Sequence, residues 1–244
     1  MFLRDVLLRD WPTQAAYPFN LPALQGISTI SFDRPVTFLV GENGSGKSTL
    51  LEAIAITAGF NPEGGSKGNL FSNAQTESPL HEHLRLSWFP KATHGFFFRA
   101  ESFFNFASHI DDVEREYGTG YAAYGGRSLH EQSHGESFLA LFMYRLHSRS
   151  KALYLLDEPE AALSPARQLA LLRLLWEHAQ AGTAQFIIAT HSPILLGYPD
   201  AAILSFDHSP LAKITYEETE SYRLTRQFLM HREAIFQELF GPGD

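Results

Sequence analysis

Residues 41–48 read Gly-Glu-Asn-Gly-Ser-Gly-Lys-Ser, and this stretch decides the fold. It matches the pattern GxxxxGK(S/T), in which glycines let successive backbone N–H groups curl around a phosphate. The nearly all-apolar run Val36–Val40 precedes it, and Lys47–Ala58 follows it with apolar residues at helical spacing. A strand, a glycine-rich turn and a helix in this order predict an α/β protein that holds the phosphates of a nucleotide.

The side chains of this loop have expected tasks at such a site. Lys47 reaches the β- and γ-phosphates, while the Ser48 hydroxyl ligates Mg²⁺. The start of the helix adds the positive end of its dipole. The candidate nucleotide-binding residues are therefore Asn43, Gly44, Ser45, Gly46, Lys47, Ser48 and Thr49.

Two adjacent acids follow a second apolar run. Ala152–Leu156 predicts a buried strand, and Asp157 and Glu158 come directly after it. A strand end beside the phosphate loop lets the first carboxylate hold Mg²⁺, directly or through water. The neighbouring carboxylate points elsewhere and is placed to orient and deprotonate an attacking water. The pair predicts a metal ligand, Asp157, and a general base, Glu158.

The rest of the chain alternates strand-like and helix-like segments, which is typical of an α/β fold. We find no internal repeat and no linker, so we expect one domain over residues 1–244. The further expected strands are Phe2–Leu8, Ile27–Phe32 and Gln185–Ala189, with hairpins formed by His81–Phe89 and His94–Arg99 and by Ala202–Phe206 and Ala212–Tyr216. The further expected helices are Phe103–Tyr117, Gly135–His147, Pro165–Gln180 and an amphipathic Ser221–Phe240.

Composition excludes several classes of function. The 244 residues include no cysteine, which excludes disulfides, cysteine-ligated zinc, iron–sulfur clusters and a thiol nucleophile, and which suits a cytoplasmic protein. The longest apolar run, Phe138–Tyr144, is far shorter than the ~18 residues of a bilayer span, so we expect no membrane segment. The net charge of −8 argues against a broad DNA-binding surface, although a local basic patch remains compatible with it.

Two further short motifs accompany the phosphate loop (residues 41–48) and the paired acids. Residues 132–136 read Gln-Ser-His-Gly-Glu before a predicted helix, and residues 190–193 read Thr-His-Ser-Pro after a predicted strand. With the phosphate loop and the paired acids, they resemble the ABC-type ATPase superfamily, in its soluble branch of SMC, RecF-like and small AAA-annotated ATPases. The resemblance implies a P-loop NTPase fold of ABC-ATPase type: a mostly parallel central sheet flanked by helices, with an antiparallel β subregion and a small helical insertion.

The resemblance also implies roles and an assembly. Ser133, Gly135 and Glu136 stand in the signature motif that contacts ATP, and His191 stands as the catalytic switch histidine. A signature loop cannot reach the ATP held by its own phosphate loop. The resemblance therefore implies a head-to-tail homodimer that forms around ATP and Mg²⁺.

The sequence departs from the family pattern at three positions. Gln132 and His134 replace a leucine and a glycine of the signature, and Ser164 replaces the usual aspartate of the D-loop. The first two changes leave Ser133 and Gly135, the positions that contact the γ-phosphate, in place. The third puts communication between subunits in doubt.

Two assignments stay open at this stage. The family places a glutamine near Mg²⁺ and its water, but here Glu101 follows the strand, and Gln75 is the alternative in a loop. We assign Glu101 to the metal site by its position. For the aromatic side chain that stacks on adenine, the sequence offers Tyr17, Phe19 and Phe32 without a choice among them.

A zinc protease is a competing interpretation of one segment. His130–His134 matches HExxH, which places two histidines on one face of a helix. Glycines at 125, 126 and 135 surround the motif and interrupt the continuous helix that this chemistry needs. We therefore favour the signature interpretation.

The expected function is that of a switch ATPase, which hydrolyses ATP to ADP and phosphate and acts in nucleic-acid maintenance or defence with a nucleic-acid or protein partner. The ATP-binding subunit of a membrane transporter is the alternative, and a small-molecule P-loop kinase is a third hypothesis. The interval between Lys47 and Ser133 is too short for the long coiled coil of SMC proteins.

Overall fold

The structure is a computed structural model that describes residues 1–12, 16–66, 78–118, 121, 126–128, 130 and 151–241. Its described strands form a seven-stranded sheet in the order β10-β9-β3-β8-β7-β6-β4 and a three-stranded sheet in the order β2-β1-β5. The larger sheet contains β3 (Val36–Val40), β4 (Gly65–Ser66), β6 (His94–Arg99), β7 (Ala152–Asp157), β8 (Ala184–Ala189), β9 (Ala202–Ser205) and β10 (Ala212–Ile214). The smaller sheet contains β1 (Leu3–Leu8), β2 (Thr29–Ser31) and β5 (Leu84–Trp88). The described α-helices are α1 (Lys47–Ala58), α2 (Phe103–Tyr117), α4 (Pro165–Gln180), α5 (Pro193–Leu196) and α6 (Glu220–Phe240).

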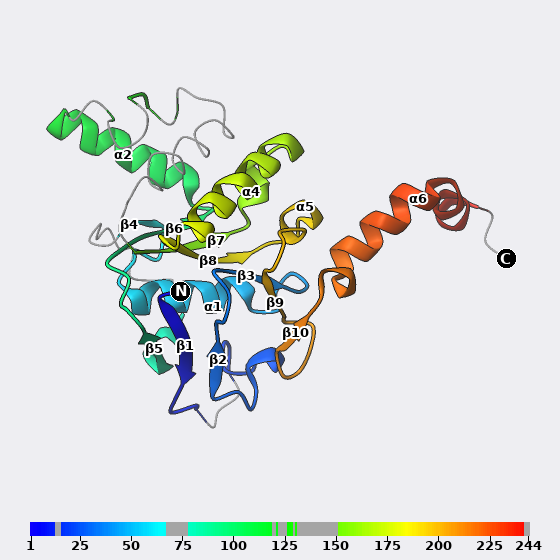
Figure 1. Cartoon of the computed structure of the whole chain (residues 1–244), viewed down its shortest axis with the longest axis horizontal. Helices are drawn as coiled ribbons and strands as arrows, with labels where there is room; N and C mark the ends of the chain where they lie inside the picture. Colours follow the sequence, from blue (N-terminus) through cyan, green and yellow to red (C-terminus); the bar gives the residue numbers. More distant parts are fainter. Residues whose placement is uncertain are drawn as a thin grey trace.

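The larger sheet is mostly parallel, as the sequence predicts. The neighbouring strands β6, β7, β8, β3 and β9 run parallel, while β10 and β4 pair antiparallel at the two edges. Every residue of β3, β7 and β8 is buried, because both faces of the sheet are covered. Figure 1 shows α1 and the smaller sheet on one side of the central sheet, and α2 and α4 on the other.

Strand alternation divides the apolar core between these two sides. Successive side chains of a strand point to opposite faces, so Phe38 packs on the side of α4 and Leu39 on the side of α1. Leu50 and Ile54 of α1 fill the first side, and Leu171 of α4 fills the second. The apolar pattern read from the sequence therefore becomes two cores with one sheet between them.

Several predicted segments are confirmed with their bounds. The structure places β3, α1, α2 and α4 at the residues that apolar periodicity indicates, and the hairpin of β9 and β10 is present. The predicted helix Gly135–His147 lies outside the described residues. Among the residues that the structure does describe, no helix is long and apolar enough to cross a membrane.

The hairpin expected between His81–Phe89 and His94–Arg99 is wrong. β5 pairs with β1 in the smaller sheet, whereas β6 joins the central sheet beside β7. β6 carries three consecutive buried residues, Phe96–Phe98, which need cover on both faces, while β5 is mostly half-exposed. The chain between these strands therefore crosses from one sheet to the other instead of turning back.

The last helix departs from this packing. The helix predicted at Ser221–Phe240 is confirmed as α6, but none of its residues is buried. Its backbone is interrupted at His231, where φ is −134° and ψ is 34°. Figure 1 shows α6 extending away from both sheets and bending toward its end.

A buried glutamine joins the two sheets. Gln185 of β8 is fully buried, and its Oε1 accepts hydrogen bonds from the backbone N–H groups of Phe2 (2.7 Å) and Leu3 (2.8 Å). Its Nε2 donates to the backbone oxygen of Leu3 (2.8 Å). The side chain thus satisfies backbone groups at the start of β1 that β8 cannot reach through its own backbone.

We expect Gln185→Leu to lower the free energy of unfolding by about 2–4 kcal/mol, because it removes three hydrogen bonds and leaves buried backbone groups unpaired. Chemical denaturation measures the change. The matched control, Gln180→Leu, alters an exposed glutamine at the end of α4 and should change stability by less than about 0.5 kcal/mol. Equal stabilities of the two variants would show that Gln185 does not join the sheets.

Candidate active site

The phosphate loop has the backbone shape that an anion requires. Gly44 and Gly46 have φ values of +79° and +106°, a region that side chains with a Cβ rarely adopt. Gly46 stands directly before α1, so the free N–H groups at the start of the helix face the same concavity. The loop and the helix N-terminus together form a cradle of backbone donors that fits a phosphate group.

Two side chains of this cradle, Lys47 and Ser45, are placed to bind an anion. Lys47 is buried, and its Nζ donates to the backbone oxygens of Gly41 (2.7 Å) and Glu42 (2.9 Å) of its own loop. Burial lowers the pKa of Lys47, and the nearby carboxylates of Glu158 and Asp207 oppose that shift. The Oγ of Ser45 is buried and has no hydrogen-bond partner within the described parts of the chain. A polyphosphate would supply the missing acceptor and the counter-charge.

The Ser48 hydroxyl and the Asp157 carboxylate meet as the sequence predicts. The Oγ of Ser48 donates to the Oδ1 of Asp157 at 2.9 Å, which joins the start of α1 to the end of β7. Burial raises the pKa of Asp157 to about 6, while the hydrogen bond from Ser48 and the charge of Arg99 act in the opposite direction. One hydroxyl and one carboxylate beside a phosphate cradle are oxygen donors of the kind that Mg²⁺ takes, so the residues fit that ion.

Glu158 and His191 face each other beside this pair. Glu158 adopts the left-handed φ of +50°, and its side chain is half-exposed. Its Oε1 lies 4.0 Å from the Nε2 of His191, an atom that is itself buried and has no hydrogen-bond partner among the described residues. The backbone N–H of His191 donates to the Oε1 of Glu160 (2.6 Å), which holds the histidine loop against the loop after β7.

Sequence reasoning missed Arg99, the last residue of β6. Its guanidinium lies 2.6 Å from the Glu52 carboxylate and 3.9 Å from the Asp157 carboxylate. The parallel register pairs Arg99 directly with Asp157, so a charged residue at the end of an apolar strand was the available signal. Glu101, which the sequence assigns to the metal site, has a largely exposed side chain, 3.7 Å from Arg99. Its metal role stays a prediction.

The three aromatic candidates for adenine stacking differ in exposure. Phe19 and Phe32 are buried in the core. Tyr17 is 61% exposed, and its hydroxyl forms a short hydrogen bond with the Thr49 hydroxyl of α1. Of the three, only Tyr17 is exposed, and its hydroxyl contacts the first turn of α1.

Several candidate residues lie outside the described part of the chain. They are Gln75 and the signature residues Ser133, Gly135 and Glu136. The first histidine of the HExxH match, His130, is described and lies 3.1 Å from the Ser108 hydroxyl. No group of three or more metal-ligating side chains occurs among the described residues.

A cleft of about 1010 Å³ opens on the outer side of the phosphate loop. Gly41–Ser45, His191 and residues 206–209 line it. The first turns of α6 also line it, through residues that include Arg223 and Gln227. The phosphate loop and the histidine that faces Glu158 therefore share a cleft with the last helix.

Comparisons with known proteins agree with this geometry. Residues 89–197 match the family described as "AAA domain, putative AbiEii toxin, Type IV TA system", and residues 22–87 match a family described as "AAA domain". A hemin import ATP-binding protein of Streptomyces coelicolor is 29% identical over 197 residues, which cover 75% of this chain and 69% of that protein. These matches support membership of the ABC-type ATPase superfamily. The chain is an ATP-binding protein and an ATPase.

Two further relatives of this ATPase support the same fold. A lipoprotein-releasing system ATP-binding protein of Hahella chejuensis is 24% identical over 213 residues, covering 80% of this chain and 89% of that protein. The solved ATP-binding cassette of an ABC transporter in its ADP conformation superposes with a TM-score of 0.53 at 17% identity, covering 98% of this chain and 99% of the other. The P-loop NTPase fold of ABC-ATPase type predicted from the sequence is therefore confirmed.

The raised pKa of Asp157 predicts a stabilising substitution. Its pKa in the folded protein, about 6, lies above the ordinary 3.8, so the ionised carboxylate costs folding free energy at higher pH. Asp157→Asn keeps an acceptor for Ser48 and removes the charge. It should raise the free energy of unfolding by about 1–3 kcal/mol above about pH 6, and the gain should shrink as the pH falls toward 4.

Denaturation in a chelating buffer at about pH 8 and about pH 4.5 measures this difference. The exposed Asp112→Asn on α2 is the control and should give no gain at either pH. A gain for Asp157→Asn that is equal at both pH values would contradict the assigned cause.

Proposed function

We propose that this ATPase is a nucleotide-driven switch that forms a homodimer around ATP and acts in nucleic-acid maintenance or defence. The observation that carries the proposal is the convergence of Lys47, the Ser48–Asp157 pair and the facing Glu158 and His191 at one edge of the parallel sheet. These groups supply an anion cradle, metal-binding oxygens and a carboxylate with access to water.

Each residue has a step that its position allows. The backbone of the phosphate loop and Lys47 bind and orient the phosphates, and Tyr17 offers a ring for adenine. Ser48 and Asp157 would hold Mg²⁺, which spreads the phosphate charge when bound. The half-exposed carboxylate of Glu158 accepts a proton from the attacking water, and His191 fixes the position of this water from the other side.

The homodimer supplies the groups that one chain lacks at its own site. By resemblance, Ser133, Gly135 and Glu136 of one copy close the site of the other. The phosphate loop supports this arrangement, because its outer side opens into the cleft and leaves room for a partner. ATP then joins the copies, and hydrolysis releases them.

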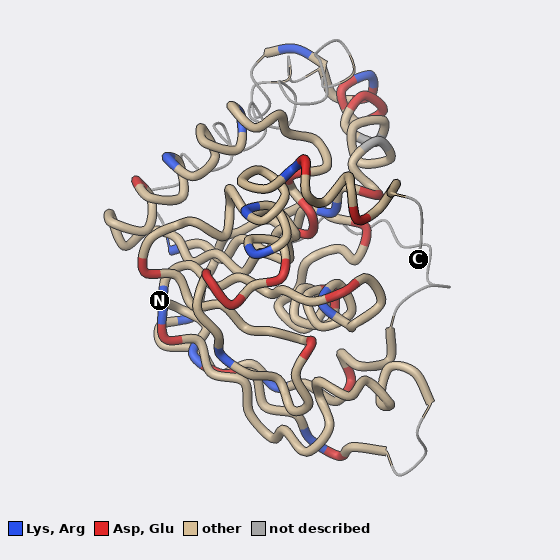
Figure 2. Tube along the Cα trace, turned by 90° about the vertical axis from the view of Figure 1, so that its right-hand side faces the viewer, with Lys and Arg blue, Asp and Glu red and all other residues tan. Residues whose placement is uncertain are grey.

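Evidence on the biological role favours defence or nucleic-acid maintenance. The family that matches residues 89–197 is described by a toxin of a toxin–antitoxin system, which supports a defence role. In the view of Figure 2, the Lys and Arg positions of the described residues are interspersed with Asp and Glu positions, so we expect any nucleic acid to meet a local patch. We place this activity in the cytoplasm, where ATP is supplied and a cysteine-free chain is suited.

A transporter subunit is the second candidate. Two curated relatives are ATP-binding proteins of hemin import and of a lipoprotein-releasing system, and this observation favours the alternative. Such a role would require a membrane protein that binds this chain.

Glu158→Gln tests the switch. The amide keeps the shape of the side chain but cannot accept the proton, so hydrolysis should fall by about 10²–10⁴-fold while ATP binding survives. With ATP and Mg²⁺ the variant should sediment as a dimer, and without nucleotide as a monomer. Adding Ser133→Arg should restore the monomer, because a bulky cation blocks the partner's site. Lys47→Ala, which loses the phosphate counter-charge, is the control that should not dimerise.

A Glu158→Gln protein that binds ATP tightly yet stays monomeric at micromolar concentration would defeat the proposed dimer. It would also show that residues 132–136 are not a signature motif.

Rates of ATP hydrolysis discriminate the two roles. We expect double-stranded DNA or RNA to change the rate of the purified protein severalfold, and the effect should weaken as salt increases. Heparin serves as the polyanion control. A rate that ignores nucleic acid, together with a membrane protein that copurifies from native cells, would favour the transporter subunit.

A further inference from the structure

We propose that α6 is an arm that docks on a second copy of this chain when the ATP-bound dimer forms. The inference rests on the homodimer proposed above and deepens it, because it names a contact surface outside the nucleotide site. It is carried by the exposure of α6, by its charge and by the way its first turns are built into the nucleotide cleft.

Exposed apolar side chains gather on α6. Among the described residues, thirteen large apolar side chains are exposed, and seven of them belong to this helix. The seven are exposed by 38–76%, and they are Leu224, Phe228, Leu229, Met230, Phe236, Leu239 and Phe240. A concentration of large exposed apolar side chains is typical of a surface that binds another protein.

The distal half of α6 has a defined apolar face. Ile235, Phe236, Leu239 and Phe240 are spaced i, i+1, i+4 and i+5, so they share one side of the helix. The bend at His231 brings the Phe236 ring within 5.8 Å of the Phe228 ring. The face is therefore continuous across the bend, and no described part of the chain buries it.

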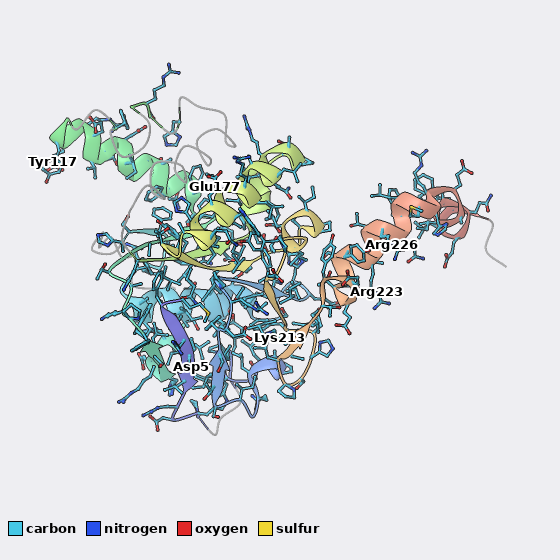
Figure 3. The ribbon with its side chains drawn as sticks, viewed as in Figure 1. Asp5, Tyr117, Glu177, Lys213, Arg223 and Arg226 are labelled. Carbon is cyan, nitrogen blue, oxygen red and sulfur yellow. The ribbon has the colours of Figure 1, made fainter. Side chains whose placement is uncertain are left out.

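The first half of the arm is basic, although α6 as a whole is neutral. Residues 221–232 contain Arg223, Arg226 and Arg232 and no acid, while Glu220, Glu233 and Glu238 lie outside this stretch, in a chain whose net charge is −8. Figure 3 shows Arg223 and Arg226 on the part of α6 that extends from the sheets. A second copy of this acidic chain offers complementary charge to such an arm.

The first turns of α6 are fixed beside the nucleotide site. The hydroxyl of Tyr216 donates to the backbone oxygen of Pro193 (2.9 Å), two residues after His191, and the Tyr216 ring lies 4.4 Å from that of Tyr222 on α6. Arg223 lines the same cleft as Gly41–Ser45 and His191. The base of the arm is thus connected to the loop that faces Glu158.

This placement identifies the occupant as a second copy. A subunit that closes the nucleotide site must approach the cleft, and α6 stands at the wall of that cleft. A two-fold axis repeats each contact, so two arms double the apolar area buried. A shared element that extends to the partner also costs little in folding, as in domain swapping.

The test uses full-length protein that carries Glu158→Gln, with ATP and Mg²⁺. Phe236→Asp combined with Leu239→Asp places two charges on the apolar face. The dissociation constant of the dimer, measured by sedimentation equilibrium, should rise at least tenfold. The matched control is Ala234→Asp combined with Gln237→Asp, which adds the same charges on the opposite face and should change the constant by less than threefold. Both proteins should keep their ATP affinity, since the altered side chains are exposed.

A second measurement locates the contact. Because the chain has no cysteine, Leu239→Cys gives a single site for a photo-crosslinker. We expect a cross-link between two chains that requires ATP, with the attachment in the partner identified by mass spectrometry.

The outcomes separate this inference from the proposed function. A Glu158→Gln protein that binds ATP without dimerising overturns both. A dimer whose dissociation constant ignores the charges on the apolar face overturns the arm alone, and so does a cross-link confined to one chain. If the protein cosediments with phosphatidylserine vesicles, and the two charges on α6 abolish this without changing the dissociation constant of the dimer, the arm binds a membrane surface instead.

Discussion

Parallel pairing in the central sheet is the constraint on which the rest of this molecule depends. Parallel strands place their carboxyl ends at the same edge, and β6, β7, β8 and β3 are all parallel neighbours. Arg99 and Asp157 end β6 and β7, and the histidine loop and the phosphate loop follow β8 and β3. Residues that are far apart in the chain therefore meet at this edge of the sheet.

Charged side chains are buried at the same edge of the sheet, and the charges around them determine how much free energy this burial costs. Lys47 and Asp157 are both buried, and burial shifts the pKa of each toward its neutral form. Arg99 partly offsets this at the carboxylate while it pairs with Glu52 of α1. Burying these charges costs folding free energy, and bound phosphate and a cation would offset that cost. Nucleotide binding would therefore stabilise the folded chain.

A chain of contacts connects the nucleotide site to the exposed helix α6. The His191 loop leads through Pro193 to Tyr216, and from there to the base of α6. The cleft on the outer side of the phosphate loop is lined by both ends of this route. Direct contacts thus join the histidine loop to the base of a helix whose apolar side chains are exposed in the single chain.

The sequence by itself determined the local elements and the chemistry of the loops. Lys47–Ala58 and Pro165–Gln180 were predictable because apolar spacing and turn residues act over a few positions. Tertiary structure alone decided which sheet β5 and β6 join, that Arg99 lies beside Asp157, and that Tyr17 is the exposed aromatic beside the phosphate loop. It also decided that α6 leaves the body, although its amphipathic pattern suggests packing. The physical reason is that strand partners and burial depend on surfaces brought together from distant parts of the chain, and no local pattern records them.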